Sequence, residues 1–141
     1  KAKEQAGPAL ENITSIPGIG RKTAIQLLII TQGFSRFANA KQLCAYVGIS
    51  PRIYESGTSV KGKPKISKLG MGRLRALLYL CAWSARRYNQ ACKDLYERLL
   101  AKGKAKKLAL IAVANKLLKQ AFAIATKQLK YDNSFALQLA S

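Results

Sequence analysis

The run MGRLRALLYLCAWSARRYNQ, residues 71–90, decides the fold that this sequence predicts. Its apolar side chains recur every three or four positions, the spacing that places them on one face of an α-helix. The helical pattern continues to about Leu100 and ends before Gly103, either as one long helix or as two helices joined near Asn89. Much of the apolar stripe is supplied by Leu74, Leu77, Leu78, Cys81 and Ala85.

Helical patterns also lie on both sides of this run. Downstream, residues 104–129 predict a helix whose lysines stand opposite its apolar side chains. Upstream, residues 7–15, 21–31 and 40–47 predict three shorter helices, which glycines separate or close. On the downstream helix the apolar face is predicted to hold Leu108, Ile111, Leu118, Phe122 and Leu129, and the polar face Lys116, Lys119, Lys127 and Lys130. The fold class is therefore mainly α, in one compact helical domain spanning residues 1–141.

Residues 50–70 interrupt the helices, because they are rich in Gly, Pro, Ser and Lys. Residues 52–55 and 58–61 flank a Ser56-Gly57 pair and predict at most a small β-hairpin in this irregular segment. Residues 132–141 are too few to form a further domain.

The charge balance points to a polyanionic partner. The chain has 25 Lys and Arg against 6 Asp and Glu, a formal net charge of +19. Nucleic acid fits such a surface, because cationic side chains that neutralise phosphates release condensed counterions. An acidic membrane would attract it too, but runs such as residues 25–30 and 77–82 are too short to span a bilayer. We therefore expect an intracellular protein without a membrane partner.

Several kinds of chemistry are excluded by composition. The chain contains no His, which rules out a Ser-His-Asp triad and a His-ligated zinc site. The carboxylates are scattered, so no metal site is expected among them. Cys44, Cys81 and Cys92 lie far apart in apolar surroundings and are expected to be buried thiols.

The motif IPGIGRKTA, residues 16–24, places two glycines in a tight turn that opens a helix. Backbone N–H groups at such a helix start favour an anion, and a basic pair at the same place adds charge. Ile16 and Ile19 are expected to fix the turn to the core. The pattern, about residues 9–32, resembles a helix-hairpin-helix DNA-binding motif, although a simple turn between helices explains the glycines equally well. Its predicted phosphate-binding residues are Gly18, Gly20, Arg21 and Lys22.

The segment YESGTS, residues 54–59, places hydroxyl groups before a series of cations. A serine that attacks a phosphodiester needs the charge of the phosphoryl transition state to be neutralised, which lysine and arginine can do. From residue chemistry alone, a pair such as Ser56-Gly57 is usually only a turn, and the nucleophile is not identified. The predicted nucleic-acid-binding cations here are Lys61, Lys63, Lys65, Lys68, Arg73 and Arg75. Arg75, Tyr79, Ala82 and Arg86 are predicted either to form a basic and aromatic track or to be part of a solvated face.

Four blocks agree, in order and spacing, with the C-terminal transposase domain of the insertion-sequence 110 transposase family, which the chain resembles over roughly residues 13–89. The resemblance implies that Ser56 is the nucleophile that forms a phosphoserine link to DNA. It implies double-stranded DNA, a guide (bridge) RNA and further copies of the protein as partners. The blocks are IPGIGRKTA (16–24), FANAKQLCAYVG (37–48), ISPRIYESGTSVKGKPKISKLG (49–70) and RLRALLYLCAW (73–83).

Family members also carry an N-terminal RuvC-like domain with four metal-binding carboxylates. Because this chain opens at Lys1 in a polar stretch and lacks such a cluster, we expect a fragment without that domain. The resemblance then implies no cofactor in this domain, Mg²⁺ in the full-length enzyme, and an isolated domain that binds nucleic acid without recombining it. A bacterial cytoplasmic, nucleoid-associated location follows from the same resemblance.

Two alternatives remain from the residues themselves. A non-catalytic helix-hairpin-helix module of a repair or RNA-associated protein explains the charge and the glycine turn but gives Ser56 no role. A ribosome-associated basic protein explains the charge but not the ordered blocks.

Overall fold

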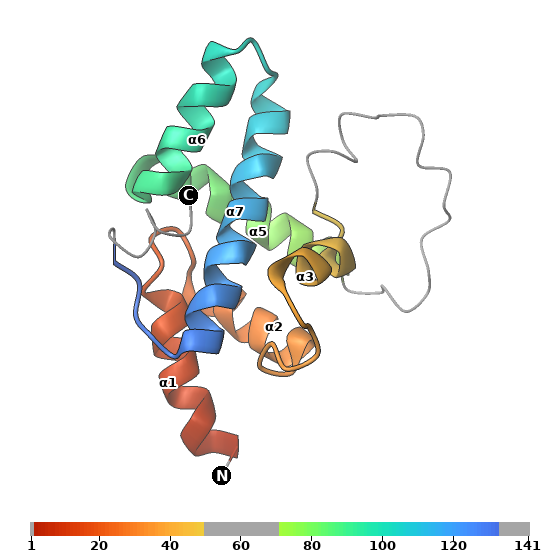
Figure 1. Cartoon of the computed structure of the whole chain (residues 1–141), viewed down its shortest axis with the longest axis vertical. Coiled ribbons are helices and arrows are strands. Elements are labelled where there is room, and N and C mark those ends of the chain that lie inside the picture. Colours follow the sequence, from red (N-terminus) through yellow and green to blue (C-terminus); the bar gives the residue numbers. More distant parts are fainter. Residues whose placement is uncertain (1, 50–70, 133–141) are drawn as a thin grey trace.

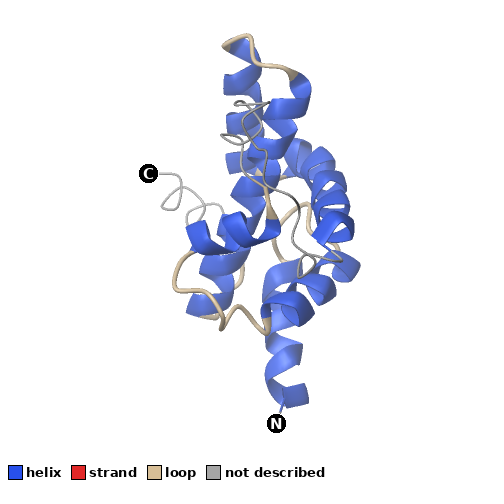
Figure 2. Cartoon of the chain, turned by 90° about the vertical axis from the view of Figure 1, so that its right-hand side faces the viewer, coloured by secondary structure: helices blue, strands red, loops and turns tan. Residues whose placement is uncertain are grey.

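The computed structural model describes the backbone of residues 2–49 and 71–132, with side chains from Gly7 onward within these ranges. All regular structure in these ranges is helical, and they contain no strand (Figures 1 and 2). The mainly α prediction is confirmed. The elements are α1 (Ala2–Thr14), α2 (Arg21–Thr31), α3 (Ala40–Val47), α5 (Met71–Tyr88), α6 (Gln90–Ala101) and α7 (Lys106–Lys127).

Helix α7 is the centre of the fold. It packs against α5, α6, α3 and α1, and Figure 1 shows it in the middle of the molecule with the other helices around it. Helix α7 buries its wide apolar face against these four helices, and this burial stabilises the fold. The fully buried side chains come from every quarter of the chain and include Ile13, Leu27, Leu43, Leu78, Leu117 and Ile124.

The face of α7 that is buried differs from the predicted stripe. Leu108, Ile111 and Phe122 are only partly buried, and Leu129 is exposed beyond the end of the helix. Alanines allow the neighbouring helices to approach from several sides, so the buried surface is wider than one stripe. The buried set consists of Ala109, Leu110, Ala112, Val113, Ala114, Leu117, Leu118, Gln120, Ala121 and Ile124. On the polar side Lys119, Lys127 and Lys130 are exposed, whereas Lys116 is partly buried.

Three helices, α1, α2 and α3, test the predicted boundaries directly. Helices α2 and α3 have the predicted bounds, and Gly48 ends α3 in the left-handed conformation at φ 84°. Helix α1 begins at Ala2 rather than at residue 7 and continues through Pro8. Proline has a φ close to the helical value, so α1 passes through it at the cost of one backbone hydrogen bond.

The long run 71–101 forms two helices, because Asn89 interrupts it. Asn89 adopts an extended backbone, and its side chain accepts a hydrogen bond from the Cys92 amide at 3.3 Å as the N-cap of α6. An asparagine in this position satisfies a backbone donor that the new helix leaves free.

By length and composition α7 could cross a bilayer, but most of its apolar window is buried inside the protein. This is the behaviour of a central core helix. The three cysteines are buried free thiols, as predicted.

Candidate nucleic-acid interface

The turn between α1 and α2, residues 15–20, is fixed to the core by two isoleucines. Ile16 and Ile19 are both buried, and the Ile19 amide donates to the Ile16 carbonyl oxygen at 3.1 Å. This confirms the prediction that the isoleucines hold the turn. Because these two side chains pack in the core, the position of the start of α2 is fixed.

Gly18 has a packing role in this turn. Its φ is +107°, and a Cβ atom placed on it would lie 2.7 Å from the Ala85 Cβ and 2.9 Å from the Ala85 Cα. Only a residue without a side chain allows this backbone to rest on α5 at that distance. Gly18 was predicted to bind phosphate, and the contact with α5 gives this glycine a packing role that the prediction did not include.

Gly20 and the basic pair after it meet solvent. Gly20 is the N-cap of α2 with an extended backbone, no side chain caps the helix there, and a Cβ on Gly20 would have no atom within 4 Å. Arg21 and Lys22 are exposed, and the first turn of α2 contains no acidic residue. The predicted combination of exposed helix start and adjacent cations is thus present, and it has the electrostatics that favour an anion.

A buried polar network holds the same turn from the other side. The Asn89 side-chain amide donates to the Pro17 carbonyl oxygen at 3.2 Å and to the Gln120 side-chain oxygen at 2.8 Å. The Asn89 oxygen also accepts from the Tyr131 hydroxyl at 3.2 Å and from the Gln120 amide at 3.3 Å. Asn89 and Gln120 are almost wholly inaccessible to water, so these partners replace it. Sequence reasoning placed Asn89 only at a helix junction and missed this network.

The two stems of the serine segment are anchored and joined. Ile49 and Met71, the described residues on either side of it, are buried. The Arg75 guanidinium donates from Nη1 to the Val47 carbonyl oxygen at 2.9 Å, which ties α5 to the last residue of α3. The Asn115 side chain donates to the Ile49 carbonyl oxygen at 2.8 Å, so α7 holds the same stem. These bonds satisfy backbone acceptors at the end of a helix.

Several predicted site residues lie outside the described residues: Ser56, Lys61, Lys63, Lys65 and Lys68. Arg73 and Arg75 are described and exposed on the first turns of α5. Arg73 is directed toward solvent by its position on the helix, whereas Arg75 is engaged with Val47. The structure therefore brings Arg75 to the stems of the segment, where it supports the backbone.

The predicted track of Arg75, Tyr79, Ala82 and Arg86 is wrong as a binding face. Ala82 is fully buried, and Tyr79 packs against the core. The Arg86 guanidinium lies 3.9 Å from the centre of the Trp83 ring and 5.7 Å from that of Tyr96. The apolar side of α5 faces the core, so of this row only Arg75 is exposed, while Tyr79, Ala82 and Arg86 pack against the protein.

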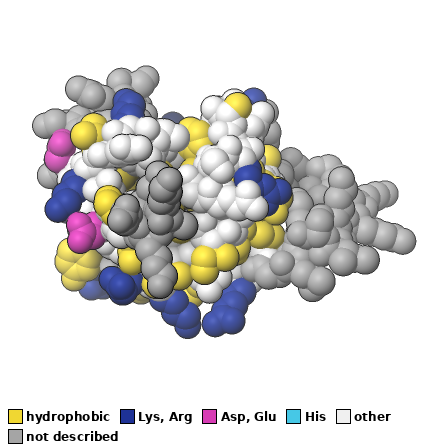
Figure 3. All heavy atoms as spheres, turned by 90° about the horizontal axis from the view of Figure 1, so that it is seen from below, with side chains coloured by type: hydrophobic (Ala, Val, Ile, Leu, Met, Phe, Trp, Pro, Cys, Tyr) yellow, Lys and Arg dark blue, Asp and Glu magenta, His cyan; other side chains and the backbone are white. Residues whose placement is uncertain are grey.

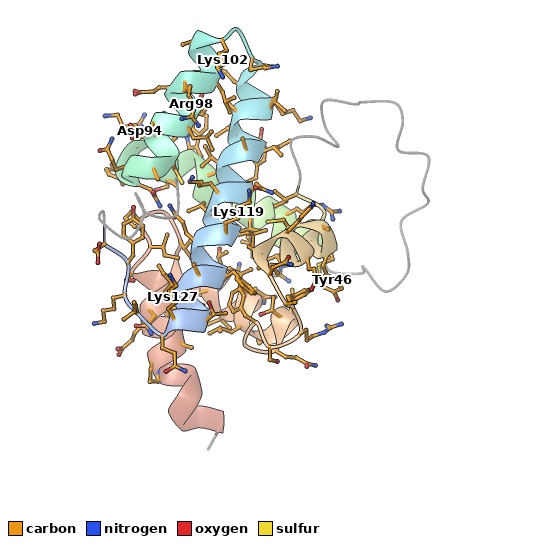
Figure 4. All side chains as sticks on the ribbon, viewed as in Figure 1. Tyr46, Asp94, Arg98, Lys102, Lys119 and Lys127 are labelled. Atoms are coloured by element: carbon orange, nitrogen blue, oxygen red, sulfur yellow. The ribbon has the colours of Figure 1, made fainter. Side chains whose placement is uncertain are left out.

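Cations are spread over the described surface. Figure 3 shows Lys and Arg side chains interspersed with apolar ones over the face seen from below, with little acidic surface. On the projecting α6–α7 hairpin, Arg98 and Lys102 follow one edge of α6 beyond Asp94, and Lys119 and Lys127 lie further down α7 (Figure 4). Among the described residues, no group of three or more His, Cys, Asp or Glu could hold a metal ion.

The thiols of Cys44 and Cys92 have low reactivity because they are buried. Burial raises the pKa of Cys44 to about 11 and that of Cys92 to about 12, although Lys119 and Lys116 respectively oppose these shifts. Burial also lowers the pKa of the Lys116 ammonium. A thiol with so high a pKa stays protonated at neutral pH and is a poor nucleophile.

Comparison with known proteins agrees with the blocks identified in the sequence. Residues 10–97 match the Transposase IS116/IS110/IS902 family. The pilin gene-inverting protein of Moraxella lacunata is 36% identical over 122 residues, which cover 85% of this chain and 38% of that protein. The transposase for insertion sequence element IS1111A of Coxiella burnetii is 31% identical over 134 residues, 93% of this chain and 36% of that protein.

A Streptomyces coelicolor protein, the insertion element IS110 uncharacterized 43.6 kDa protein, is 31% identical over 120 residues. That alignment covers 85% of this chain and 29% of the relative. The chain thus spans less than two fifths of the length of each of these three relatives.

Proposed function

The chain belongs to the IS116/IS110/IS902 transposase family, and from that premise we propose that it is the DNA-binding, serine-bearing domain of a transposase that acts as a DNA recombinase. The observation that carries this proposal is the family match over residues 10–97, which includes both the turn at 16–24 and the serine segment. Two described features support it: an exposed, uncapped and cationic helix start at α2, and anchored stems for the segment that bears Ser56.

In the proposed reaction the Ser56 hydroxyl oxygen attacks the phosphorus of a DNA phosphodiester. A new oxygen–phosphorus bond forms as the bond from phosphorus to one deoxyribose oxygen breaks. The serine proton is lost, and the leaving deoxyribose oxygen takes up a proton to become a free hydroxyl. Attack by a hydroxyl of another strand then releases the serine, so the cycle needs no net oxidant or nucleotide cofactor.

The cations of this chain have a defined part in that scheme. Charge accumulates on the phosphoryl oxygens in the transition state, and Lys68 and Arg73 are the proposed groups near Ser56 that offset it. Arg75 positions the stems through its bond to Val47, and the start of α2 binds the DNA backbone. The helix-hairpin-helix character of α1 and α2 belongs to this proposal.

The partners follow from the same proposal. They are double-stranded DNA, a guide RNA and further copies of the full-length protein, in the bacterial cytoplasm at the nucleoid. The proposal includes Mg²⁺ in the full-length enzyme, held by the carboxylates of a RuvC-like domain outside this chain. Alone, this chain is proposed to bind nucleic acid without recombining it.

The test uses the full-length parent protein and its own DNA junction. Denaturing gels and mass spectrometry of the linked peptide compare the parent with Ser56→Ala and with a matched control, Ser59→Ala, in the same segment. A covalent adduct that maps to Ser56, is lost in Ser56→Ala and is retained in Ser59→Ala is the expected result. Equal adducts or recombination in Ser56→Ala would overturn the proposal, because the nucleophile would then lie elsewhere and Ser56 would be part of a plain turn.

A further inference from the structure

The outward side of α5 carries large apolar side chains in water. Leu80 is 68% exposed and Trp83 is 52% exposed. Together with Arg73, Ala76 and Arg87 they form a row at helical spacing, and all five residues are exposed. We call this row the outer stripe. Its core-facing counterpart, with Leu74, Leu78 and Ala85, is buried, so the stripe is the face of α5 that the described part of the chain leaves uncovered.

The charge around the outer stripe indicates which kind of ligand it can bind. Helix α5 contains four arginines and no acidic residue, in a chain with a net charge of +19. Arg73 and Arg87 lie at the two ends of the stripe, about 21 Å apart along the helix axis at 1.5 Å per residue. A row of apolar side chains between two cations complements a ligand that alternates flat apolar groups with negative charges.

The Trp83 ring packs against the guanidinium of Arg86. The Arg86 guanidinium lies 3.9 Å from the centre of its ring and also reaches the ring of Tyr96 at 5.7 Å. Arg86 Nε is buried and makes no hydrogen bond among the described residues, so this side chain is placed by the two rings. With the Arg86 guanidinium packed on its ring, Trp83 remains half exposed and therefore accessible to a ligand. A fixed aromatic ring loses little conformational freedom when a ligand stacks on it.

We propose that the outer stripe binds an unpaired nucleic-acid strand, with a base stacked on Trp83 and phosphates at Arg73 and Arg87. Bases inside a duplex already stack on their neighbours, so a duplex would use the arginines but leave Trp83 and Leu80 in water. An unpaired strand has free base faces that can cover both. This inference rests on the proposed nucleic-acid binding of the chain and adds the kind of strand and the face that binds it.

The sequence provides a site-specific signal, because Trp83 is the single tryptophan of the chain. The present chain is titrated with an oligothymidylate of about 12 nucleotides, with a duplex of the same length and with an abasic deoxyribose-phosphate oligomer. Tryptophan emission reports stacking, and the anisotropy of labelled oligomers reports binding. We expect quenching by the oligothymidylate, and little quenching by the duplex or the abasic oligomer even where they bind.

Substitutions separate stacking from charge. Trp83→Ala is expected to weaken oligothymidylate binding roughly 5- to 150-fold, the range for loss of one stacked base, and Trp83→Phe to weaken it less. Leu129→Ala, which shortens an exposed apolar side chain after α7, is the matched control and should leave affinity unchanged. Arg87→Gln should reduce the salt dependence of binding by about 0.7 in the log–log slope, the value for one phosphate of a single strand. Circular dichroism checks that each variant is folded.

Each other outcome overturns one specific statement. Oligothymidylate binding with unchanged emission and an unaffected Trp83→Ala variant would refute the stripe while leaving nucleic-acid binding intact. Emission that changes with protein concentration in the absence of oligomer would assign the stripe to a protein contact instead. Failure to bind any of the oligomers would refute the nucleic-acid binding in the proposed function, and the stripe proposal with it.

Discussion

Replacing Gly18 by alanine tests whether the turn at 16–24 is built by packing. The added Cβ would lie 2.7 Å from the Ala85 Cβ and 2.9 Å from the Ala85 Cα, on a helix backbone that cannot rotate away. The φ of +107° adds backbone strain of about 1–2 kcal/mol for any L-residue. Relief of the overlap by movement of the turn or of α5 costs a further 1–3 kcal/mol, roughly. We expect Gly18→Ala to lower the free energy of unfolding by about 2–5 kcal/mol.

Gly20→Ala is the matched control, two residues away in the same turn. Gly20 has φ −83° and ψ 169°, and a Cβ there meets no atom within 4 Å. Alanine at this N-cap is expected to change stability by no more than about 1 kcal/mol, because its cost as a cap opposes its lower entropy in the unfolded chain. Urea denaturation followed by circular dichroism gives both free energies.

A Gly18→Ala variant as stable as the parent would refute the close approach of the turn to α5. Equal destabilisation by Gly18→Ala and Gly20→Ala would show that any change to the turn is disruptive and that packing on Ala85 is not the reason.

Asn89→Ala should lower the free energy of unfolding by about 3–5 kcal/mol in urea denaturation, since it removes the hydrogen bonds of Asn89 to the Pro17 carbonyl oxygen and to the buried Gln120 side chain; full stability would refute the network. Arg75→Gln should cost about 1 kcal/mol of stability through the lost bond to the end of α3, whereas Arg73→Gln should leave stability within about 0.5 kcal/mol and lower the salt slope of DNA binding by about 0.9. The opposite ranking in the two assays would show that Arg75 is the phosphate-binding arginine. Cys44 and Cys92, with pKa values raised from 9.0 to about 11 and about 12, contribute stability that is present below pH 9 and is lost as pH rises toward those values. At pH 10 the loss should be about 1.4 kcal/mol for each thiol relative to neutral pH, and it should be absent from a Cys44→Ala/Cys92→Ala variant with the same pH series.

Where the sequence contains strong local signals, it predicts the fold closely. Helices α2 and α3 have the predicted bounds because Gly20 precedes α2 and Gly33 follows its cap residue, and because Asn39 and Gly48 cap α3. The division of the long run at Asn89 was one of two predicted possibilities, and the N-cap bond to Cys92 explains the outcome. The charge and the order of the blocks sufficed to predict the family that residues 10–97 match.

Tertiary contacts account for what the sequence did not predict. Ala82 suits either face of a helix, and only packing against neighbouring helices decides that it is buried and that Trp83 is outside. The contact of Gly18 with Ala85 and the bond of Asn89 to Gln120 join positions distant in sequence, and no local pattern specifies them. The same applies to Arg75. Its charge and position predict a phosphate ligand, whereas in the structure its guanidinium donates to the Val47 carbonyl oxygen.

These contacts change the physical account of the turn at 16–24. It is held by buried isoleucines, by Gly18 on α5 and by the bond from Asn89 to Pro17, so its shape exists before any ligand arrives. A preformed site spends little binding free energy on ordering its own backbone. Substitutions at Arg21 and Lys22, which are exposed, should therefore alter DNA affinity without altering stability, whereas substitutions at Gly18 and Asn89 should lower stability. Separate effects on DNA affinity and on stability distinguish a rigid turn on which DNA docks from a loop whose shape depends on bound DNA.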